Sequence, residues 1–524
     1  MKIFKLILVI SVFFNPNFVR SQNGIQWQKC IGGSFGETLL SFQQTSDGGY
    51  IAAGLTRSND GDVSGNHGGY ADAWVVKMSS LGVIEWQKCL GGSSEDQAYS
   101  IEQTFDGGFI LAGWTASIDG DVVGINGSYD GWVVKLDSLG FIEWQKCLGG
   151  SDDDQSYYIK QTSDSGFIVT GRVSSLDGDV IGNHGADDGW VVKLSSLGVI
   201  QWQKCLGGSD NDYVYSIQQL SNGGYILAGR TLSVDGDVTS NYGGDDCWVI
   251  NLSDLGVIQW QNSYGGSGNE VVNSIQPTSD GGYIFVGPTG SNDVDVIGNH
   301  GGCYDALVIK LDHLGAIEWQ KCFGGSGVEY AYSIQQTSDN GYIIAGSSTS
   351  NDGDVSGLHG FYDDVWVIKL SDIGTIQWQK CLGGGSIEFA YSIQVTSDGG
   401  YAFVGRTNSF DGDITSNHGG TDGWIVKLYQ VIGIDELSTL SNFNVYPMPS
   451  DDELNIEYSF SEAADVTLEL RNILGETLIR LVFLKNQVGL NFTKLPISNL
   501  YNGIYFLNIS TKEGSVSKKV IVNH

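Results

Sequence analysis

Seven copies of one sequence unit fill most of this chain. Each copy carries a Trp-Gln pair, and successive tryptophans lie 58 or 59 residues apart, at Trp27, Trp86, Trp144, Trp202, Trp260, Trp319 and Trp378. A fixed period means that every copy folds as the same supersecondary module, and that neighbouring modules bury each other's apolar faces. The sequence therefore predicts an array of seven equivalent modules.

Each unit has the pattern of four short β-strands. In the second copy we expect strands at 99–104, 109–115, 132–136 and 141–148, with a hairpin turn at Asp106-Gly107-Gly108. No segment of the repeats has a helical period. Four antiparallel strands in each of seven units predict an all-β fold, a seven-bladed β-propeller.

The two ends of the array predict how it closes. It begins at 25–30 with a fourth strand that no earlier strand precedes, and it ends at 424–428 with a third strand that no fourth strand follows. We expect the N-terminal strand to complete the last blade, because this closes the ring and protects the sheet edges.

The repeats also resemble a known family. The segment from Gly91 to Ile101, with its Gly-Gly-Ser start and Tyr-Ser-Ile end, and the following strand from Gly108 to Thr115 are similar to the repeats of bacterial β-propeller proteins. The resemblance covers residues 25–428 and implies the fold. It does not imply a function, since propellers host many activities.

The N-terminus predicts export. Lys2 and Lys5 precede an apolar run at 6–14, and Val19-Arg20-Ser21 is typical of a cleavage site, so residues 1–21 are expected to be a signal peptide. The apolar run is too short for a membrane span, and we expect no transmembrane segment in the mature chain. The propeller is then expected at 22–428.

After the repeats we expect a linker at 429–442 and a small β-sandwich at 443–524, where apolar positions alternate. This last segment is similar to the C-terminal sorting domain (type A) of the type IX secretion system of Bacteroidetes. The residues that carry the resemblance include Tyr446, Pro447, Pro449, Gly475, Gly503, Tyr505, Lys518 and Lys519. The resemblance implies recognition by the type IX machinery, followed by secretion or anchoring at the outer-membrane cell surface.

The net charge of the chain narrows the classes of molecule that it can bind. The net charge of −33 argues against nucleic acid and anionic membranes as partners, and favours cations or neutral molecules.

Six cysteines occupy one repeat position, which Ser263 fills in the remaining copy, and we expect them to be buried and unpaired. Cys247 and Cys303 lie outside this pattern and could pair with each other.

Four acidic positions recur in all seven copies, on the face of the propeller that carries the long loops. The first is Glu37, Asp96, Asp154, Asp212, Glu270, Glu329 and Glu388, expected in the loop that crosses between blades. The next two form an Asp-x-Asp pair: Asp60/Asp62, Asp119/Asp121, Asp177/Asp179, Asp235/Asp237, Asp293/Asp295, Asp352/Asp354 and Asp411/Asp413. The last precedes the third strand: Asp72, Asp130, Asp188, Asp246, Asp305, Asp364 and Asp422.

Two interpretations of the Asp-x-Asp loops stand side by side. Together with the later carboxylate, they could supply the oxygen ligands that Ca²⁺ prefers. Alternatively, these aspartates cap turns by accepting hydrogen bonds from nearby backbone N–H groups. Calcium is therefore a candidate cofactor, and no other is indicated.

The sequence favours a binding function. It holds no nucleophile elbow, phosphate loop or zinc motif, and we assign no catalytic residue. We expect recognition of an extracellular glycan through the acidic loop face, with Trp114 as an exposed ligand contact. One alternative is a glycoside hydrolase of endoglucanase type, which needs two carboxylates at a defined separation. Another is a structural or adhesion component that binds a surface protein.

Overall fold

The computed structural model describes residues 24–429, 440–447, 449–460, 463–472, 477–486, 488–511 and 514–524. The expected signal peptide and most of the expected linker lie outside these residues. Contacts divide the chain into two compact units, Met1–Gln430 and Val431–His524, which are described separately. Within the described residues, no helix is long and apolar enough to cross a membrane.

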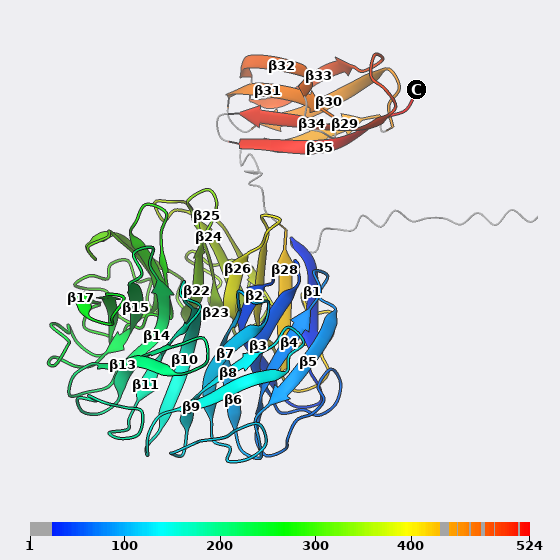
Figure 1. The fold of residues 1–524 in the computed structure, drawn as a ribbon. Coiled ribbons are helices and arrows are strands. Elements are labelled where there is room, and N and C mark those ends of the chain that lie inside the picture. The colour runs from blue at the N-terminus through cyan, green and yellow to red at the C-terminus, as the bar shows by residue number, and fades with distance from the viewer. Residues whose placement is uncertain are drawn as a thin grey trace, which may run out of the picture. The chain divides into compact units, whose positions relative to one another are not determined.

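In its described residues, the first unit consists of seven antiparallel sheets of four strands each, and it resembles a propeller (Figure 1). The first three sheets contain β2 (Glu37–Gln44), β3 (Tyr50–Thr56), β4 (Asp72–Met78) and β5 (Ile84–Leu90); β6 (Asp96–Gln103), β7 (Phe109–Thr115), β8 (Asp130–Leu136) and β9 (Ile142–Leu148); and β10 (Asp154–Gln161), β11 (Phe167–Val173), β12 (Asp188–Leu194) and β13 (Ile200–Leu206). The fourth and fifth contain β14 (Asp212–Gln219), β15 (Tyr225–Thr231), β16 (Asp246–Leu252) and β17 (Ile258–Tyr264); and β18 (Ser274–Pro277), β19 (Tyr283–Thr289), β20 (Asp305–Leu311) and β21 (Ile317–Phe323). The sixth contains β22 (Glu329–Gln336), β23 (Tyr342–Ser348), β24 (Asp364–Leu370) and β25 (Ile376–Leu382), and the seventh contains β26 (Glu388–Val395), β27 (Tyr401–Thr407), β28 (Asp422–Leu428) and β1 (Ile25–Ile31).

The N-terminal strand lies where the sequence places it. β1 pairs antiparallel with β28, so that the seventh sheet has the order β1-β28-β27-β26. The seventh sheet also contacts the first. The backbone N–H of Glu37 donates to the carbonyl of Thr421 at 2.7 Å, and Leu39 shares a core cluster with Val404 and Ile425. Segments from the two ends of the array are therefore side by side.

In every sheet except the fifth, where β18 begins at Ser274, the first strand begins earlier than the hydrophobic pattern indicates. In the second sheet it begins at Asp96, which pairs with Thr115, rather than at Tyr99. The register then shifts between Ala98 and Ser100, which is a β-bulge. Alternation is interrupted at such a bulge, so the pattern alone misses the start of the strand.

Tryptophan packing joins each sheet to the next. Trp86 of β5 meets Phe109 of the following sheet edge to face, with ring centroids 5.7 Å apart. A Cβ added to Gly140, in the turn before β9, would lie 2.9 Å from the Trp86 ring, and the φ of Gly140 is +80°. The Trp-Gln marker therefore recurs because the tryptophan covers the neighbouring module.

All eight cysteines are free. The six at the repeat position are buried, as predicted. Cys247 is buried and Cys303 is exposed, so the pairing considered for these two residues is not formed.

A buried lysine braces six of the seven sheets. In the second sheet, the Lys135 ammonium lies 3.1 Å from Asp106 and 3.0 Å from Glu143, and it donates to the carbonyl of Leu136. The fourth sheet has Asn251 at the lysine position, and Asn222 replaces the aspartate of the hairpin turn. The charged pair is thus replaced as a unit, because a buried ammonium needs a counter-charge.

The second unit has two sheets, as the sequence predicts for a small sandwich. One contains β29 (Leu440–Tyr446), β30 (Glu453–Phe460) and β33 (Gly489–Pro496); the other contains β31 (Ala464–Arg471), β32 (Thr477–Asn486), β34 (Gly503–Thr511) and β35 (Gly514–Val522). Side chains of both sheets, such as Leu454 and Leu507, share one buried core.

Candidate functional site

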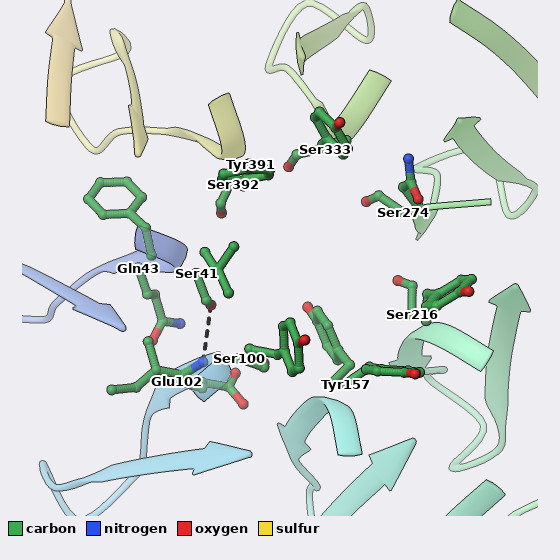
Figure 2. Close-up of a pocket in the computed structure, with 18 of the residues that line it drawn as sticks. Ser41, Gln43, Ser100, Glu102, Tyr157, Ser216, Ser274, Ser333, Tyr391 and Ser392 are labelled. Carbon is green, nitrogen blue, oxygen red and sulfur yellow. Dashed lines mark hydrogen bonds between the residues drawn. The ribbon is translucent and has the colours of Figure 1, made fainter. Parts of the chain in front are cut away.

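The first strands of all seven sheets line one central pocket of about 560 Å³. Figure 2 shows side chains from successive sheets pointing towards its open centre. Three sets of residues form its wall. From the long-loop end these are Leu40, Tyr99, Tyr157, Tyr215, Asn273, Tyr332 and Tyr391; then Ser41, Ser100, Tyr158, Ser216, Ser274, Ser333 and Ser392; and near the hairpin turns Gln43, Glu102, Lys160, Gln218, Gln276, Gln335 and Gln394.

The serine and glutamine layers tie neighbouring sheets together. Ile101 donates its backbone N–H to the Ser41 hydroxyl of the preceding sheet at 3.0 Å, which Figure 2 marks with a dashed line. Gln44 of the first sheet donates its backbone N–H to the Gln394 side chain of the seventh sheet at 2.6 Å. These layers therefore hold the first strands at fixed distances from one another.

The pocket is close to neutral although the protein is strongly acidic. The charged side chains among its lining residues are Glu102 and Lys160, and these form an ion pair at 3.0 Å. The remaining polar groups are hydroxyls and amides. Such a wall can hydrogen-bond an uncharged polar ligand without a net field that selects for ionic charge.

The tyrosine layer is the most ligand-like part of the wall. Each tyrosine occupies the bulge of its strand and is half-buried. The rings of Tyr157 and Tyr215 lie 5.2 Å apart, and those of Tyr332 and Tyr391 lie 5.1 Å apart. Burial raises the pKa of Tyr215 to about 12, so its hydroxyl keeps its proton at neutral pH.

Arginines stand behind two of these tyrosines. Arg172 and Arg230 form ion pairs with Asp187 and Asp245, at 2.6 and 2.7 Å, and Arg230 also stacks on the ring of Tyr213 at 4.3 Å. The sequence alone does not indicate that the tyrosine layer and these arginines lie at the pocket. The recurring Tyr-Ser-Ile segment marks the position of each tyrosine, but it does not reveal the bulge that turns the tyrosine side chain into the pocket.

The first acidic position is a structural centre of each sheet. These seven residues are fully buried. Six of them start the first strands, so their expected placement in a loop is wrong, whereas Glu270 precedes β18 and forms an isolated bridge with Thr289. Glu37 accepts hydrogen bonds from the N–H of Gly33 at 2.8 Å and from the Thr56 hydroxyl at 2.9 Å. This carboxylate therefore joins the loop that crosses from the preceding sheet to the long loop of its own sheet.

The first member of each Asp-x-Asp pair is a cap. The Asp119 carboxylate accepts from the backbone N–H of Ser93 at 2.7 Å. The same contact recurs in the other six sheets, where the accepting residues are Asp60, Asp177, Asp235, Asp293, Asp352 and Asp411. These contacts agree with the turn-capping interpretation.

The second member of each pair fastens the long loop to the crossing loop through its backbone. Its N–H donates at 2.8–3.1 Å to the carbonyl of the first glycine in that loop. The donors are Asp62, Asp121, Asp179, Asp237, Asp295, Asp354 and Asp413, and the acceptors are Gly32, Gly91, Gly149, Gly207, Gly265, Gly324 and Gly383. These aspartates are therefore fixed in place by the loop backbone.

The carboxylates of these second members have different partners from sheet to sheet. Those of Asp62, Asp121, Asp354 and Asp413 accept from the N–H of the same first glycine at 3.3–3.4 Å. Asp179 instead forms an ion pair with Lys146 at 3.5 Å. One buried oxygen of Asp237 has no hydrogen-bond partner within the described residues, and burial raises the pKa of Asp295.

The last acidic position is fully buried and is held by histidine in five sheets. His67 Nδ1 lies 2.6 Å from Asp72, and His67 Nε2 lies 3.8 Å from Asp121 of the next sheet. His300, His359 and His418 bridge neighbouring sheets in the same way, to Asp354, Asp413 and Asp62. The histidine thus links the aspartate that precedes the third strand of one sheet to the second aspartate of the Asp-x-Asp pair in the next sheet.

Burial raises the pKa of these last aspartates, to about 6 for Asp188 and Asp364 and to about 7 for Asp246. One oxygen has no hydrogen-bond partner within the described residues in Asp72, Asp188, Asp246, Asp305, Asp364 and Asp422. In the fourth sheet Tyr242 replaces the histidine, so Asp246 lacks that imidazole.

The structure differs from the arrangement expected of calcium loops. Within the described ranges, no group of three or more His, Cys, Asp or Glu side chains is placed to hold a metal ion. Among the described residues, the second aspartate of each pair does not form a three-carboxylate cluster with the other acids of its own loop. These second aspartates are Asp62, Asp121, Asp179, Asp237, Asp295, Asp354 and Asp413.

The physical reason is that each acid has a different partner. The first aspartate of a pair is turned towards a backbone N–H, the second faces the crossing loop or a side chain of a neighbouring sheet, and the last is buried, in five sheets against a histidine. The residues present therefore fit turn capping and inter-sheet bridging better than calcium loops, and calcium stays a prediction.

Trp114 is only 6% exposed, so the expectation that it is an exposed ligand contact is wrong. Its ring packs edge to face on Tyr129, with centroids 4.9 Å apart, and its Nε1 donates to the Tyr99 hydroxyl at 3.4 Å. Trp114 therefore supports a pocket tyrosine from behind.

The sorting-signal residues lie in the second unit. Tyr505 is buried and its hydroxyl donates to the carbonyl of Tyr501 at 2.8 Å, whereas Tyr446 is 44% exposed. Lys518 stacks over the Phe443 ring at 5.5 Å. Gly475 lies outside the described residues.

Comparison with known proteins bears directly on this unit. Residues 444–523 match the family model of the secretion system C-terminal sorting domain. This segment is a type IX sorting domain. The protein is therefore exported, and it is either secreted or attached at the bacterial cell surface.

No curated protein matches the sequence. Among solved structures, the chain is similar to PorZ, described as an essential bacterial surface component of the type IX secretion system of Porphyromonas gingivalis, with 12% identity and a TM-score of 0.40; the match covers 94% of this chain and 60% of PorZ. A fungal alcohol oxidase of the AA5 family in complex with copper shows 11% identity and a TM-score of 0.42, over 95% of this chain and 100% of the oxidase. Sqt1 from Chaetomium thermophilum shows 10% identity and a TM-score of 0.39, over 77% of this chain and 99% of Sqt1. These likenesses leave the function open.

Proposed function

We propose that the exported protein is a closed seven-bladed β-propeller that binds an extracellular glycan at the long-loop mouth of its central pocket. The type IX machinery delivers it to the cell exterior, where the propeller at 22–428 acts as a binding module. The observation that carries this proposal is the tyrosine layer at the mouth of a neutral pocket.

Ring closure is supported by contacts between the first and seventh sheets. β1 completes the seventh sheet, and Gln44 contacts that sheet in two directions. Its N–H donates to Gln394, and its side-chain oxygen accepts from the N–H of Ser397 at 2.8 Å. The same glutamine contacts occur between interior neighbours, for example from Gln103 N–H to Gln43 at 2.5 Å. A common geometry at the seam and within the array favours a continuous ring of seven blades.

Glycan binding is supported by the chemistry of the pocket. Aromatic faces pack on the C–H faces of sugar rings, and hydroxyl and amide groups exchange hydrogen bonds with sugar hydroxyls. The tyrosine rings supply the first feature, and the serine and glutamine layers supply the second. A neutral wall suits an uncharged polysaccharide, which the net charge of −33 does not repel.

The loop acids have a supporting role in this proposal. Their contacts hold the crossing loops and join adjacent sheets, so they shape the mouth rather than contact the ligand. Calcium binding by the Asp-x-Asp loops would stiffen the same region. It is a separate part of the proposal, to be tested with a chelator.

A glycan-binding screen of the mature chain, run with Ca²⁺ and again with chelator, tests the proposal. We expect binding of at least one neutral polysaccharide, lost on Tyr332→Ala and Tyr391→Ala. Tyr70→Ala is the matched control, because this tyrosine is 76% exposed in a long loop outside the pocket. Binding that both pocket variants keep would contradict the site. Binding of no glycan would shift the weight to a protein partner, and release of reducing ends would point to a hydrolase.

A further inference from the structure

Two positions beside the mouth of the pocket face each other within a sheet. One is near the end of the second strand and the other directly precedes the third strand. They make contact as Arg172 with Asp187 at 2.6 Å, as Arg230 with Asp245 at 2.7 Å, as Trp114 with Tyr129, and as Ser347 with Asp363 at 3.2 Å. In four sheets, therefore, the residues at these positions contact each other, and in two of them, the third and fourth, they form an ion pair.

The pairing of opposite charges is absent from the sixth and seventh sheets, although each keeps one of the two charged residues. The sixth sheet keeps the carboxylate, Asp363, but has Ser347 in place of the arginine. The seventh sheet keeps the arginine, Arg406, but has Thr421 in place of the carboxylate. In the part of the chain that the structure describes, no carboxylate lies within 4.0 Å of the Arg406 guanidinium. Its Nε is buried and has no hydrogen-bond partner among those residues.

These two groups are electrostatic neighbours although they form no ion pair. Burial raises the pKa of the Asp363 carboxyl, and the hydrogen bond from the Ser347 hydroxyl and, to a smaller extent, the nearby charge of Arg406 partly offset this effect. Arg406 is half-buried and lies over the Phe389 ring at 4.8 Å. The Arg406 guanidinium and the Asp363 carboxylate, which also accepts from the Ser347 hydroxyl, thus lie on adjacent sheets without an ion pair between them.

Aromatic rings occupy the region around them. Phe389 and Tyr391 are stacked at 12°, with centroids 5.9 Å apart, and Tyr332 approaches both rings, at 6.3 and 5.1 Å. Tyr332 and Tyr391 belong to the pocket lining. Arg406 therefore lies beside an aromatic cluster whose two tyrosines line the pocket.

We propose that this junction is one sugar-binding subsite, in which Arg406 and Asp363 orient a neutral sugar ring packed on Tyr332 and Phe389. The proposal rests on glycan binding at the pocket, and it names the residues that determine specificity. Arg406 donates to a ring or hydroxyl oxygen of the sugar, and Asp363 accepts from a neighbouring hydroxyl. A half-buried guanidinium without a carboxylate partner is unfavourable, and a ligand that accepts from its planar fork removes this penalty.

The arrangement favours a neutral ligand over an anionic one. An acidic sugar would gain from Arg406 but would meet the Asp363 carboxylate and the field of an acidic protein. A neutral sugar offers an acceptor and a donor on adjacent carbons and satisfies both groups. Because the split pair occurs once in the seven sheets, the protein is expected to bind one sugar chain rather than seven.

Titration calorimetry of the mature chain with neutral hexasaccharides of the cello-, xylo-, manno- and laminari-series tests the subsite. We expect one ligand per chain, and an affinity at least tenfold lower in Arg406→Gln and in Asp363→Asn. Arg57→Gln is the matched control, because it removes the same charge from an exposed arginine outside the pocket lining and should change affinity less than twofold. Thermal unfolding of every variant shows whether it is folded, and Arg406→Lys provides a conservative substitution that keeps the charge but loses the fork.

Each outcome separates the two proposals. If Tyr332→Ala abolishes binding while Arg406→Gln and Asp363→Asn stay within twofold of the wild type, the subsite is wrong and the pocket is right. A stoichiometry near seven overturns the subsite as well. If no hexasaccharide binds, or if none of these variants changes binding, both the subsite and the proposed function fail.

Discussion

Removal of the counter-charges of one buried lysine should destabilise the protein more than removal of the lysine itself. The Lys135 side chain is 4% exposed, whereas its partners Asp106 and Glu143 are 60% and 48% exposed. In Asp106→Asn/Glu143→Gln, the ammonium stays buried without a counter-charge and keeps only neutral acceptors, the Leu136 carbonyl and amide oxygens such as the one that Gln201 offers to Lys193 in the third sheet. Loss of the partners of a buried ion costs about 3–5 kcal/mol, and the partial exposure of these carboxylates reduces this to about 2–4 kcal/mol.

In Lys135→Asn, the two carboxylates remain half in water and need no other partner. This change should cost about 1–2 kcal/mol, mainly through lost packing of the lysine stem. The natural precedent is the fourth sheet, where Asn222 and Asn251 occupy both positions. The triple variant Asp106→Asn/Glu143→Gln/Lys135→Asn should therefore be more stable than Asp106→Asn/Glu143→Gln. Urea unfolding of the mature chain measures these differences. Equal destabilisation by the lysine and carboxylate changes would refute the reasoning.

Three further predictions concern stability. The folded-state pKa of Asp246 is about 7, above its ordinary value, so the contribution of its protonated form to stability is full below about pH 4 and is lost as pH rises through 7. Asp246→Asn should therefore be more stable than the wild type by about 2–4 kcal/mol at pH 8. An equal advantage at pH 4 would contradict this. Stability depends on pH in the opposite direction for hairpin aspartates whose pKa is lowered to about 2, such as Asp164 beside Lys193, because protonation removes their ion pairs. The melting temperature should therefore fall as pH drops from 4 towards 2. An unchanged melting temperature over that range would count against these ion pairs. Gly140→Ala should cost about 1–3 kcal/mol more than Gly107→Ala in urea unfolding, because both glycines have positive φ but only the first meets a tryptophan ring.

The repeat makes the sheets predictable from the sequence. Once the period is known, the alternation around Phe109–Thr115 and the hairpin turn before it indicate strands, and the unmatched strand at 25–30 indicates its pairing with β28. These features depend on short-range chemistry and on a periodicity that recurs in every copy.

The roles of side chains are less predictable, because they depend on contacts between sheets. Asp96 has the sequence context of a loop ligand, yet it is a buried strand residue that serves the loops on either side. Asp179 has the context of a calcium ligand, yet its carboxylate meets Lys146. Tyr99 faces the pocket because of a bulge that the alternation pattern conceals.

Comparison of the copies with one another carries more information than any single copy. Asn222 and Asn251 depart from the repeat together, which reports a contact between the hairpin turn and the third strand. Arg172 with Asp187 and Arg230 with Asp245 report a second contact in the same way, and Arg406 with Thr421 breaks the rule. Such departures show where the molecule ceases to be sevenfold.

The central claim is that a glycan binds at the mouth of the pocket. A crystal structure of the mature chain, grown with the tightest-binding neutral oligosaccharide of the screen, tests it most directly. The account predicts sugar density against Tyr332 and Phe389, with oxygens within hydrogen-bond distance of Arg406 and Asp363. Sugar density confined to the outer loops or the sheet edges, with the central pocket empty of sugar, would contradict it.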